Sequence, residues 1–206
     1  MALMPDIWRE VSNLTGEADF AAWFGNDHPV EIEIGCGKGA FLAGAATARP
    51  DVNFIGVEMD GSYLKIARRK IEIRCLANVR LVHGDMVYFL LNHIRDGSIA
   101  AYHIYFPDPW PKRRHAKRRM VRDVSVQQFA RTLIPGGRLV VKTDVPVNYT
   151  RIRRAVNDSG LFTLEDMRAW GLDEAPDGDI PTNFERKYHQ IGKRTFYARW
   201  RAKVQA

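Results

Sequence analysis

The chain carries its most concentrated chemistry in a cationic segment that follows a proline-bounded acidic turn. The turn covers residues 106–110 (FPDPW) and is called here the Asp108 turn. In the basic segment, residues 112–122, seven of eleven side chains are Lys or Arg and none is acidic. These seven account for the whole net charge of +7. A basic patch concentrated in one place is typical of proteins that bind a polyanion.

The Asp108 turn itself presents a carboxylate and an aromatic ring. Pro107 and Pro109 restrict the backbone on both sides of Asp108, so they fix the direction of its side chain. Trp110 offers a flat apolar surface on which a nucleobase could stack. The alternative is a rigid structural turn with a packed Trp. The functional interpretation is favoured because the basic segment begins two residues after Trp110.

A second motif is a glycine turn at residues 33–39 (EIGCGKG), which ends a predicted strand and opens a predicted helix. Glycine permits a tight turn there and lets a ligand approach the backbone. Glu58 follows 19 positions after Gly39, at the end of the next predicted strand. An acid at that position of a doubly wound sheet accepts hydrogen bonds from ribose hydroxyls. The pattern therefore predicts a nucleoside-containing cofactor, although a purely structural turn is the alternative.

Charge discriminates between two cofactor classes. A dinucleotide fingerprint, G-x-G-x-x-G/A, is satisfied loosely by Gly35, Gly37 and Ala40. The tighter match is G-x-G-x-G, formed with Gly39 and preceded by Glu33. A carboxylate beside a pyrophosphate would be repelled, whereas S-adenosylmethionine is cationic and has no phosphate. The sequence favours S-adenosylmethionine over NAD.

Acidic residues end four predicted strands in succession or lie within two or three residues of their ends. In an open α/β sheet, ligands bind outside the carboxyl ends of the strands. Each acid alone is more often a surface group or a helix cap, but together they predict a negative rim that suits a cationic cofactor. They are Glu33, Glu58, Asp85 and Asp108.

Alternating β-branched runs and helical patterns predict the elements that position these residues. Strand–helix alternation is typical of a parallel sheet with helices on both faces. We therefore predict an α/β, Rossmann-like, mostly parallel doubly wound sheet with a C-terminal antiparallel strand. The predicted strands are 30–34, 53–58, 79–83, 101–106, 138–142 and 196–201; the predicted helices lie around 40–46, 64–71 and 126–133. In the second helix, Leu64, Ala67 and Ile71 recur at helical spacing and Asp60 is placed to cap it, and residues 135–137 (PGG) should end the third.

Composition limits the remaining possibilities. A chain of 206 residues that is 46% hydrophobic is long enough for one domain, which we expect to cover residues 1–206. No apolar run approaches the roughly 20 residues of a membrane span, and no signal peptide is recognisable. Cys36 and Cys75 lack metal-ligand spacing and predict free thiols in a reducing cytoplasm. The histidines form no cluster, so no metal site is expected.

With these motifs in place, the chain resembles the bacterial tRNA (guanine-N7-)-methyltransferases over about residues 30–200. The Asp108 turn with its basic continuation is specific to that family, and the glycine turn is shared more widely. Further matches are residues 56–58 (GVE), 84–85 (GD), 135–137 (PGG), 142–144 (KTD) and 182–185 (TNFE). The resemblance implies a class I methyltransferase fold and methyl transfer from S-adenosylmethionine to guanosine N7 of tRNA, at variable-loop position 46.

The resemblance also implies roles for individual residues. Glu33, Gly35, Gly37, Gly39, Glu58, Asp85 and Asp108 match the family's cofactor site, with Asp108 at the proposed catalytic position. Lys112, Asp144, Thr182, Asn183, Phe184 and Glu185 match its substrate contacts. Arg113, Arg114, His115, Lys117, Arg118 and Arg119 match its RNA-interacting stretch. The region before the first strand is shorter than in many relatives, which carry a longer N-terminal extension.

Three alternatives to this function stay open at the level of sequence. A small-molecule methyltransferase could share the fold, although the localised charge argues against it. An RNA-binding module without catalysis would make the glycine turn purely structural. A nicotinamide dehydrogenase lacks a recognisable hydride-transfer acid or Tyr-Lys pair. The expected partner is tRNA, with no membrane and no metal, and the protein is expected to act as a monomer or homodimer.

Overall fold

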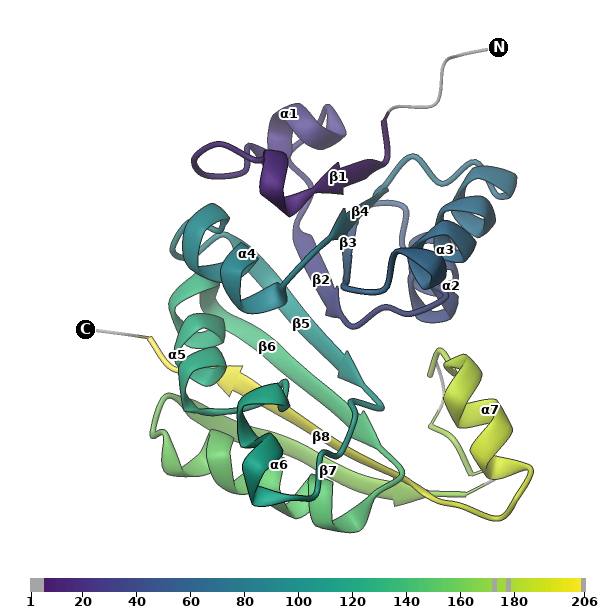
Figure 1. Cartoon of the computed structure of the whole chain (residues 1–206), viewed down its shortest axis with the longest axis vertical. Coiled ribbons are helices and arrows are strands. Elements are labelled where there is room, and N and C mark those ends of the chain that lie inside the picture. Colours follow the sequence, from purple (N-terminus) through teal and green to yellow (C-terminus); the bar gives the residue numbers. More distant parts are fainter. Residues whose placement is uncertain (1–5, 172–173, 177–178, 205–206) are drawn as a thin grey trace.

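The computed structural model of the chain describes residues 6–171, 174–176 and 179–204. Eight strands form one sheet in the order β1-β4-β3-β2-β5-β6-β8-β7 (Figure 1). Strand β8 pairs antiparallel with both β6 and β7, whereas the other pairs are parallel. The strands are β1 (Trp8–Glu10), β2 (Val30–Ile34), β3 (Asn53–Glu58), β4 (Val79–His83), β5 (Ile99–Tyr105), β6 (Leu133–Thr143), β7 (Phe162–Trp170) and β8 (Thr195–Ala202).

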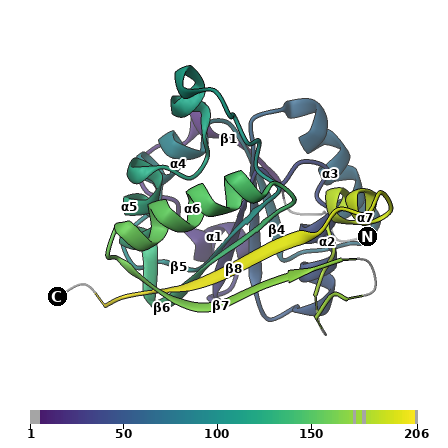
Figure 2. The same cartoon turned by 90° about the horizontal axis from the view of Figure 1, so that it is seen from below.

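Seven α-helices connect the described strands, and short 3₁₀ turns occur at Val11–Asn13 and Arg113–Arg118. Helix α6 lies across one side of β7 and β8 (Figure 2). The helices are α1 (Phe20–Phe24), α2 (Ala40–Ala48), α3 (Gly61–Ile73), α4 (Met86–His93), α5 (Asp123–Thr132), α6 (Pro146–Asp158) and α7 (Asn183–His189).

Two apolar cores pack on the two faces of the sheet. The larger core joins α4, α5 and α6 to the strands, with Phe89, Phe129 and Trp200 fully buried. The smaller core joins α2 and α3 to β3 and β4. In α3 the predicted stripe Leu64, Ala67 and Ile71 is wholly buried, which confirms its helical periodicity. By packing both faces of the sheet, these cores hold the carboxyl ends of the parallel strands side by side at one end of the strands.

The start of α3 has the cap that the sequence predicts. Asp60 caps α3, because its carboxylate accepts hydrogen bonds from the amides of Ser62 and Tyr63.

The boundary between α5 and β6 differs from the prediction. Helix α5 ends at Thr132, and β6 begins at Leu133, five residues before the predicted strand start. The pairing of β5 with β6 shifts register between Ile99 and Ala101. The stretch 133–137 is therefore extended strand and not only a helix stop.

Two strands were not predicted. Strand β1 has only three residues and adds to the edge of the sheet beside β4. Strand β7 is the opposite edge, and its middle carries Glu165, Asp166 and Arg168 where a buried face would need apolar residues. Edge strands need only one partner and tolerate charge, so their sequences lack the alternation that identifies inner strands.

Other expectations concern absences and can be compared only with the described part of the chain. There, no helix has the length and apolar character needed to cross a membrane. In the same ranges, no three His, Cys, Asp or Glu side chains gather as a metal site requires. Cys36 is buried, Cys75 is exposed, and both are free thiols.

Candidate active site

A cavity of about 510 Å³ opens at the carboxyl ends of the central parallel strands. Its volume is that of a typical small-molecule site. Three of the four predicted rim acids line it, and three cationic side chains of the basic segment line it with them. These six residues are Glu58, Asp85, Asp108, Lys117, Arg119 and Arg122. The structure thus brings the predicted cofactor acids and part of the predicted RNA-binding stretch to one place.

The glycine turn shapes the floor of this cavity. A Cβ atom on Gly35 would lie 3.0 Å from the Cε of Met120, and Gly35 has φ of +71°. Gly39 has φ of +66°, and its Cβ would lie 2.8 Å from the Cβ of Ala67 on α3. A side chain at either position would be strained, since L residues rarely adopt positive φ. Glycine is therefore required both by backbone conformation and by the close packing of α2 on α3.

Glu58 and Asp85 are held by backbone amides at the cavity wall. One oxygen of Glu58 accepts from Gly37 N at 2.9 Å, and the other accepts from Met59 N at 2.8 Å and Asp60 N at 3.0 Å. Asp85 caps α4 by accepting from Tyr88 N at 2.8 Å. A carboxylate oxygen can accept more than one hydrogen bond. Both acids are therefore oriented by the fold and keep the capacity to accept from a ligand hydroxyl or amine.

Glu33 lies beneath the cavity and not among its lining residues. It is 4% exposed, and its Oε2 atom has no hydrogen-bond partner within the described structure. Burial is the main cause that raises the pKa of Glu33 well above 4.5, and the nearby Glu58 raises it further. A hydrogen bond from the backbone of Leu42 and the charge of Lys142 act in the opposite direction. A buried, unpartnered carboxylate oxygen is costly, so this position is suited to receive a cationic donor.

The Asp108 turn has an unusual backbone. Phe106 and Trp110 have φ of +51° and +36°, and each is a non-glycine residue in the left-handed region. Asp108 lies between them with an exposed side chain at the cavity. Such conformations cost about 1–3 kcal/mol each and persist where the surroundings impose them. The sequence indicated rigidity from the prolines, but it contained no signal for the two positive φ angles.

Side chains from outside the turn hold its carbonyl groups. Asn148 Nδ2 donates to Pro107 O at 3.3 Å, and Arg151 donates to Pro109 O at 3.0 Å. Arg119 Nε donates to Trp110 O at 3.1 Å. Helix α6 and the basic segment therefore fix the turn from two sides.

The basic segment divides into two parts. Lys117 and Arg119 line the cavity, and the His115 ring packs edge-on against Trp110 with centroids 5.4 Å apart. Lys112 and Arg114 are exposed and lie outside the cavity. The predicted roles of Arg113, Arg118 and Asn183 concern side chains outside the described part of the structure.

The predicted substrate residues of α7 form a separate group near the cavity. Thr182 and Glu185 form a capping box at the start of α7, and Glu185 is 1% exposed. Phe184 is 48% exposed, and its ring centroid lies 6.3 Å from that of Phe106. Asp144 pairs with Lys193 at 2.5 Å. Among these residues only Phe184 offers an exposed surface, and nothing in the sequence ranked it above Glu185.

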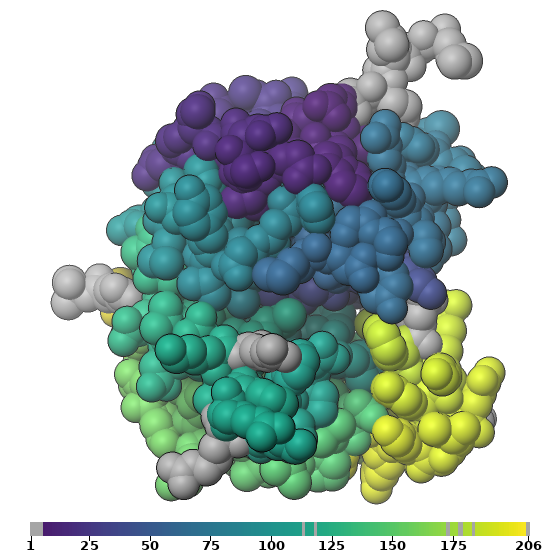
Figure 3. Space-filling view, in the orientation of Figure 1, coloured from purple at the N-terminus to yellow at the C-terminus, as the bar shows by residue number. Residues whose placement is uncertain are grey.

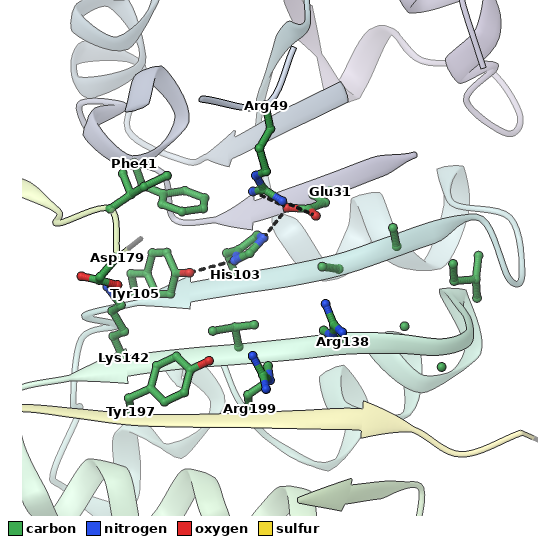
Figure 4. A pocket seen from close by; sticks show the side chains of 17 residues that line it. Glu31, Phe41, Arg49, His103, Tyr105, Arg138, Lys142, Asp179, Tyr197 and Arg199 are labelled. Carbon is green, nitrogen blue, oxygen red and sulfur yellow. Dashed lines mark hydrogen bonds and ion pairs between the residues drawn. The ribbon is translucent and has the colours of Figure 1, made fainter. Parts of the chain in front are cut away.

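A second cavity of about 430 Å³ lies on the face of the sheet that α2 covers, and it is lined by residues of β2, β5, β6 and β8 together with Phe41 and Arg49 (Figure 4). Glu31 accepts two hydrogen bonds from Arg49 at 2.7 and 2.8 Å, and pairs with His103 Nε2 at 2.8 Å. His103 Nδ1 in turn contacts the hydroxyl of Tyr105 at 2.8 Å. Burial alone would raise the pKa of Glu31, but His103 and Arg49 lower it to about 2. No sequence pattern indicated this network.

Comparison with known proteins identifies the relatives of this arrangement. A family model described as "Putative methyltransferase" matches residues 27–198. The tRNA (guanine-N(7)-)-methyltransferase of Nocardia farcinica is 40% identical over 92% of this chain and 72% of its own length. The enzyme of the same name from Streptococcus thermophilus is 34% identical over 87% of this chain and 85% of its own length.

Solved structures show the same fold at lower sequence identity. An antibiotic-related methyltransferase matches with a TM-score of 0.66 at 16% identity, over 93% of this chain and 97% of its own. A phosphoethanolamine N-methyltransferase from Haemonchus contortus, solved in complex with S-adenosyl-L-methionine, matches with a TM-score of 0.53 at 14% identity. That match covers 88% of this chain and 50% of the other. Both support the Rossmann-like methyltransferase fold predicted from the sequence.

Proposed function

This chain belongs to the tRNA (guanine-N(7)-)-methyltransferase family, and we propose that it methylates N7 of a guanosine in tRNA with S-adenosylmethionine as donor. The observation that carries the proposal is the shared cavity. Asp108 lines it together with Glu58 and Asp85 on the strand side and with Lys117 and Arg119 on the basic side. A site for a cationic nucleoside cofactor thus adjoins a site for a polyanion.

The residues at the strand ends fit the cofactor by their chemistry. Glu58 would accept hydrogen bonds from the ribose hydroxyls, and Asp85 would accept one from the adenine amino group, since both carboxylates line the cavity. Glu33 suits the cationic end of the molecule, because its buried Oε2 atom has no partner within the described structure. When bound, S-adenosylmethionine supplies an electrophilic methyl group on a sulfonium. The negative charge of Glu58 and Asp85, which line the cavity, favours such a ligand over a dinucleotide with a pyrophosphate.

The reaction at guanine N7 requires alignment and no general base. N7 carries a free lone pair, so no proton has to leave before it attacks the methyl carbon. Alignment of reacting groups can lower a barrier by about 7–11 kcal/mol. The product is a cationic purine, and the exposed Asp108 carboxylate stabilises the positive charge that develops on the ring. Because backbone strain and three side-chain hydrogen bonds fix the turn, Asp108 needs little reorganisation to do so.

RNA contacts bring the base to this position. A guanine that takes part in tertiary pairing has to leave its stack to reach a recessed cofactor. Lys112, Arg114 and Lys117 are exposed around the turn and hold phosphates while the base enters. Phe184 offers an exposed ring beside Phe106 for the base or its neighbour. The target position 46 of the variable loop follows from the family resemblance.

Three further points belong to the proposal. The chain acts as one domain, since the two cores share the same sheet. It works in the cytoplasm, where tRNA is found, as a monomer or homodimer. Sedimentation of the purified protein with and without tRNA measures the oligomeric state.

The deciding experiment is methylation of bulk tRNA with labelled S-adenosylmethionine, followed by identification of the modified nucleoside. We expect 7-methylguanosine. Single-turnover rates with Asp108→Ala then separate chemistry from binding, since this variant should lose methyl transfer much more than tRNA affinity. Asp108→Asn should recover part of the orientation and little of the charge effect. A normal rate in Asp108→Ala would show that the turn is only structural.

A further inference from the structure

Lys142, near the end of β6, is a buried cation that belongs to the matched motif 142–144 but was assigned no role from the sequence. Its side chain is 2% exposed and forms an ion pair with Glu185 at 3.2 Å and another with Asp179. The ammonium also lies over the Tyr105 ring at 5.2 Å and the Trp170 ring at 5.4 Å. Figure 4 shows Lys142 beside Asp179 and Tyr105 at one end of the second cavity. A lysine with this exposure needs its anionic partners.

Both partners of Lys142 come from one stretch of chain, residues 179–193, called here the α7 segment. Glu185 also accepts hydrogen bonds from Trp170 Nε1 at 3.2 Å and from Thr182 N at 3.4 Å. Ile180 packs so closely on α2 that a Cβ on Gly44 would lie 2.7 Å from it. In Figures 1 and 3 this segment lies beside α2 and α3 at the edge of the molecule. Lys142 is thus the cation that joins two carboxylates of the segment to the sheet.

The docked segment places aromatic side chains next to the Asp108 turn. The rings of Phe184 and Tyr188 lie 6.3 and 6.2 Å from the ring of Phe106, which precedes Asp108 by two residues. Lys193, at the end of the segment, pairs with Asp144 and lies 4.2 Å from the Tyr188 ring. A shift of α7 would therefore move the exposed Phe184 away from the turn.

We propose that Lys142 is a positioning residue for the RNA substrate, because its charge holds the α7 segment against the sheet and so sets Phe184 beside the Asp108 turn. The inference rests on the proposed function. Without the ammonium, the carboxylates of Asp179 and Glu185, 14% and 1% exposed, would be buried without a cation. Their burial would then be unfavourable, and the segment would open to hydrate them.

The test compares Lys142→Met, which keeps the apolar stem, with Lys142→Arg, which keeps the charge. In Lys142→Met, the tRNA concentration for half-maximal single-turnover methylation should rise about 10- to 100-fold, which is the range for loss of one stacking contact between a base and an aromatic ring such as Phe184. Calorimetry with S-adenosylhomocysteine should show a much smaller change in Kd than this, since Lys142 does not line the cofactor cavity and acts on Glu33 only through its charge. Hydrogen exchange should accelerate in residues 179–193 and not in β2–β4. Lys142→Arg should stay close to wild type.

A wild-type protein that methylates no tRNA would refute the proposed function itself. If wild type is active, unchanged tRNA dependence and exchange in Lys142→Met would overturn the role of Lys142. Equal losses in the Met and Arg variants would overturn it too, because shape and not charge would then matter. Should Lys142→Met fail to fold, Asp179→Asn tests the same contact, since Asp179 has no proposed contact with substrate. That variant should also raise the half-saturating tRNA concentration, and an unaltered value would count against the inference.

Discussion

Replacing Glu31 by Gln should reduce the stability of the protein in a pH-dependent way. The carboxylate is 12% exposed and bonds both Arg49 and His103. These partners lower the pKa of Glu31 from 4.5 to about 2 despite its burial. Since one pKa unit is about 1.4 kcal/mol, the ionised group contributes about 3 kcal/mol to folding at pH 7. A carboxyl group whose pKa is lower in the folded than in the unfolded protein stabilises the fold fully at pH values above the unfolded-state pKa. That stabilisation is lost as the pH falls through the folded-state pKa.

Urea unfolding at several pH values measures this contribution. At pH 3, between the unfolded and folded pKa values, linkage leaves about 1 kcal/mol of it. The difference in unfolding free energy between wild type and Glu31→Gln should therefore shrink by about 2 kcal/mol from pH 7 to pH 3. Asp158→Asn, which breaks an exposed pair with Arg154, is a control that should change stability little at either pH. Parallel pH curves for wild type and Glu31→Gln would refute the reasoning.

Further predictions concern the cofactor turn and the basic segment. Glu58→Gln should abolish most of the thermal stabilisation by S-adenosylhomocysteine, which is about 2.7 kcal/mol at 100 times Kd in wild type; an undiminished shift would exclude Glu58 from the site. Arg114→Gln with Lys117→Gln should weaken tRNA binding and lower its log–log salt slope by up to about two, since each phosphate contact contributes about 0.9 or less; unchanged salt dependence would mean a merely solvated surface. Gly39→Ala should destabilise the fold by at least about 1–2 kcal/mol in urea unfolding, from positive φ and the contact with Ala67; wild-type stability would contradict it.

The sequence was sufficient for the parts of the fold that have strong periodicity or special backbone needs. The inner strands, the α3 stripe and the Asp60 cap follow from alternation, helical spacing and capping chemistry. The glycine turn follows from positive φ, which Gly35 and Gly39 show. Strand β7 was missed because a charged edge strand carries no such pattern. Rules that use only neighbouring residues therefore identified the elements whose conformation depends on neighbouring residues.

The contacts between distant segments could not be predicted from the sequence. Glu33 and Glu58 both end strands, yet only Glu58 lines the cavity, and the depth of Glu33 depends on how α2 packs over it. Glu185 was expected to contact the substrate, but its carboxylate is bonded to Trp170, Thr182 and Lys142, which lie up to 43 positions away. Spacing along the sequence indicates which residues lie at the same end of the sheet. Which of them line the cavity, and which groups they bond, depends on tertiary packing.

Charge connects the two sides of the proposed active site. Methyl transfer to N7 moves one positive charge from the sulfonium to the purine, so the net charge in the cavity is the same before and after. The location of the positive charge changes: it moves away from the carboxylates at the strand ends and toward the basic residues that face the RNA. Asp108 lies at the boundary, between Glu58 and Asp85 on one side and Lys117 and Arg119 on the other. A carboxylate fixed there is near the charge at both stages, and it gains most where the purine becomes cationic.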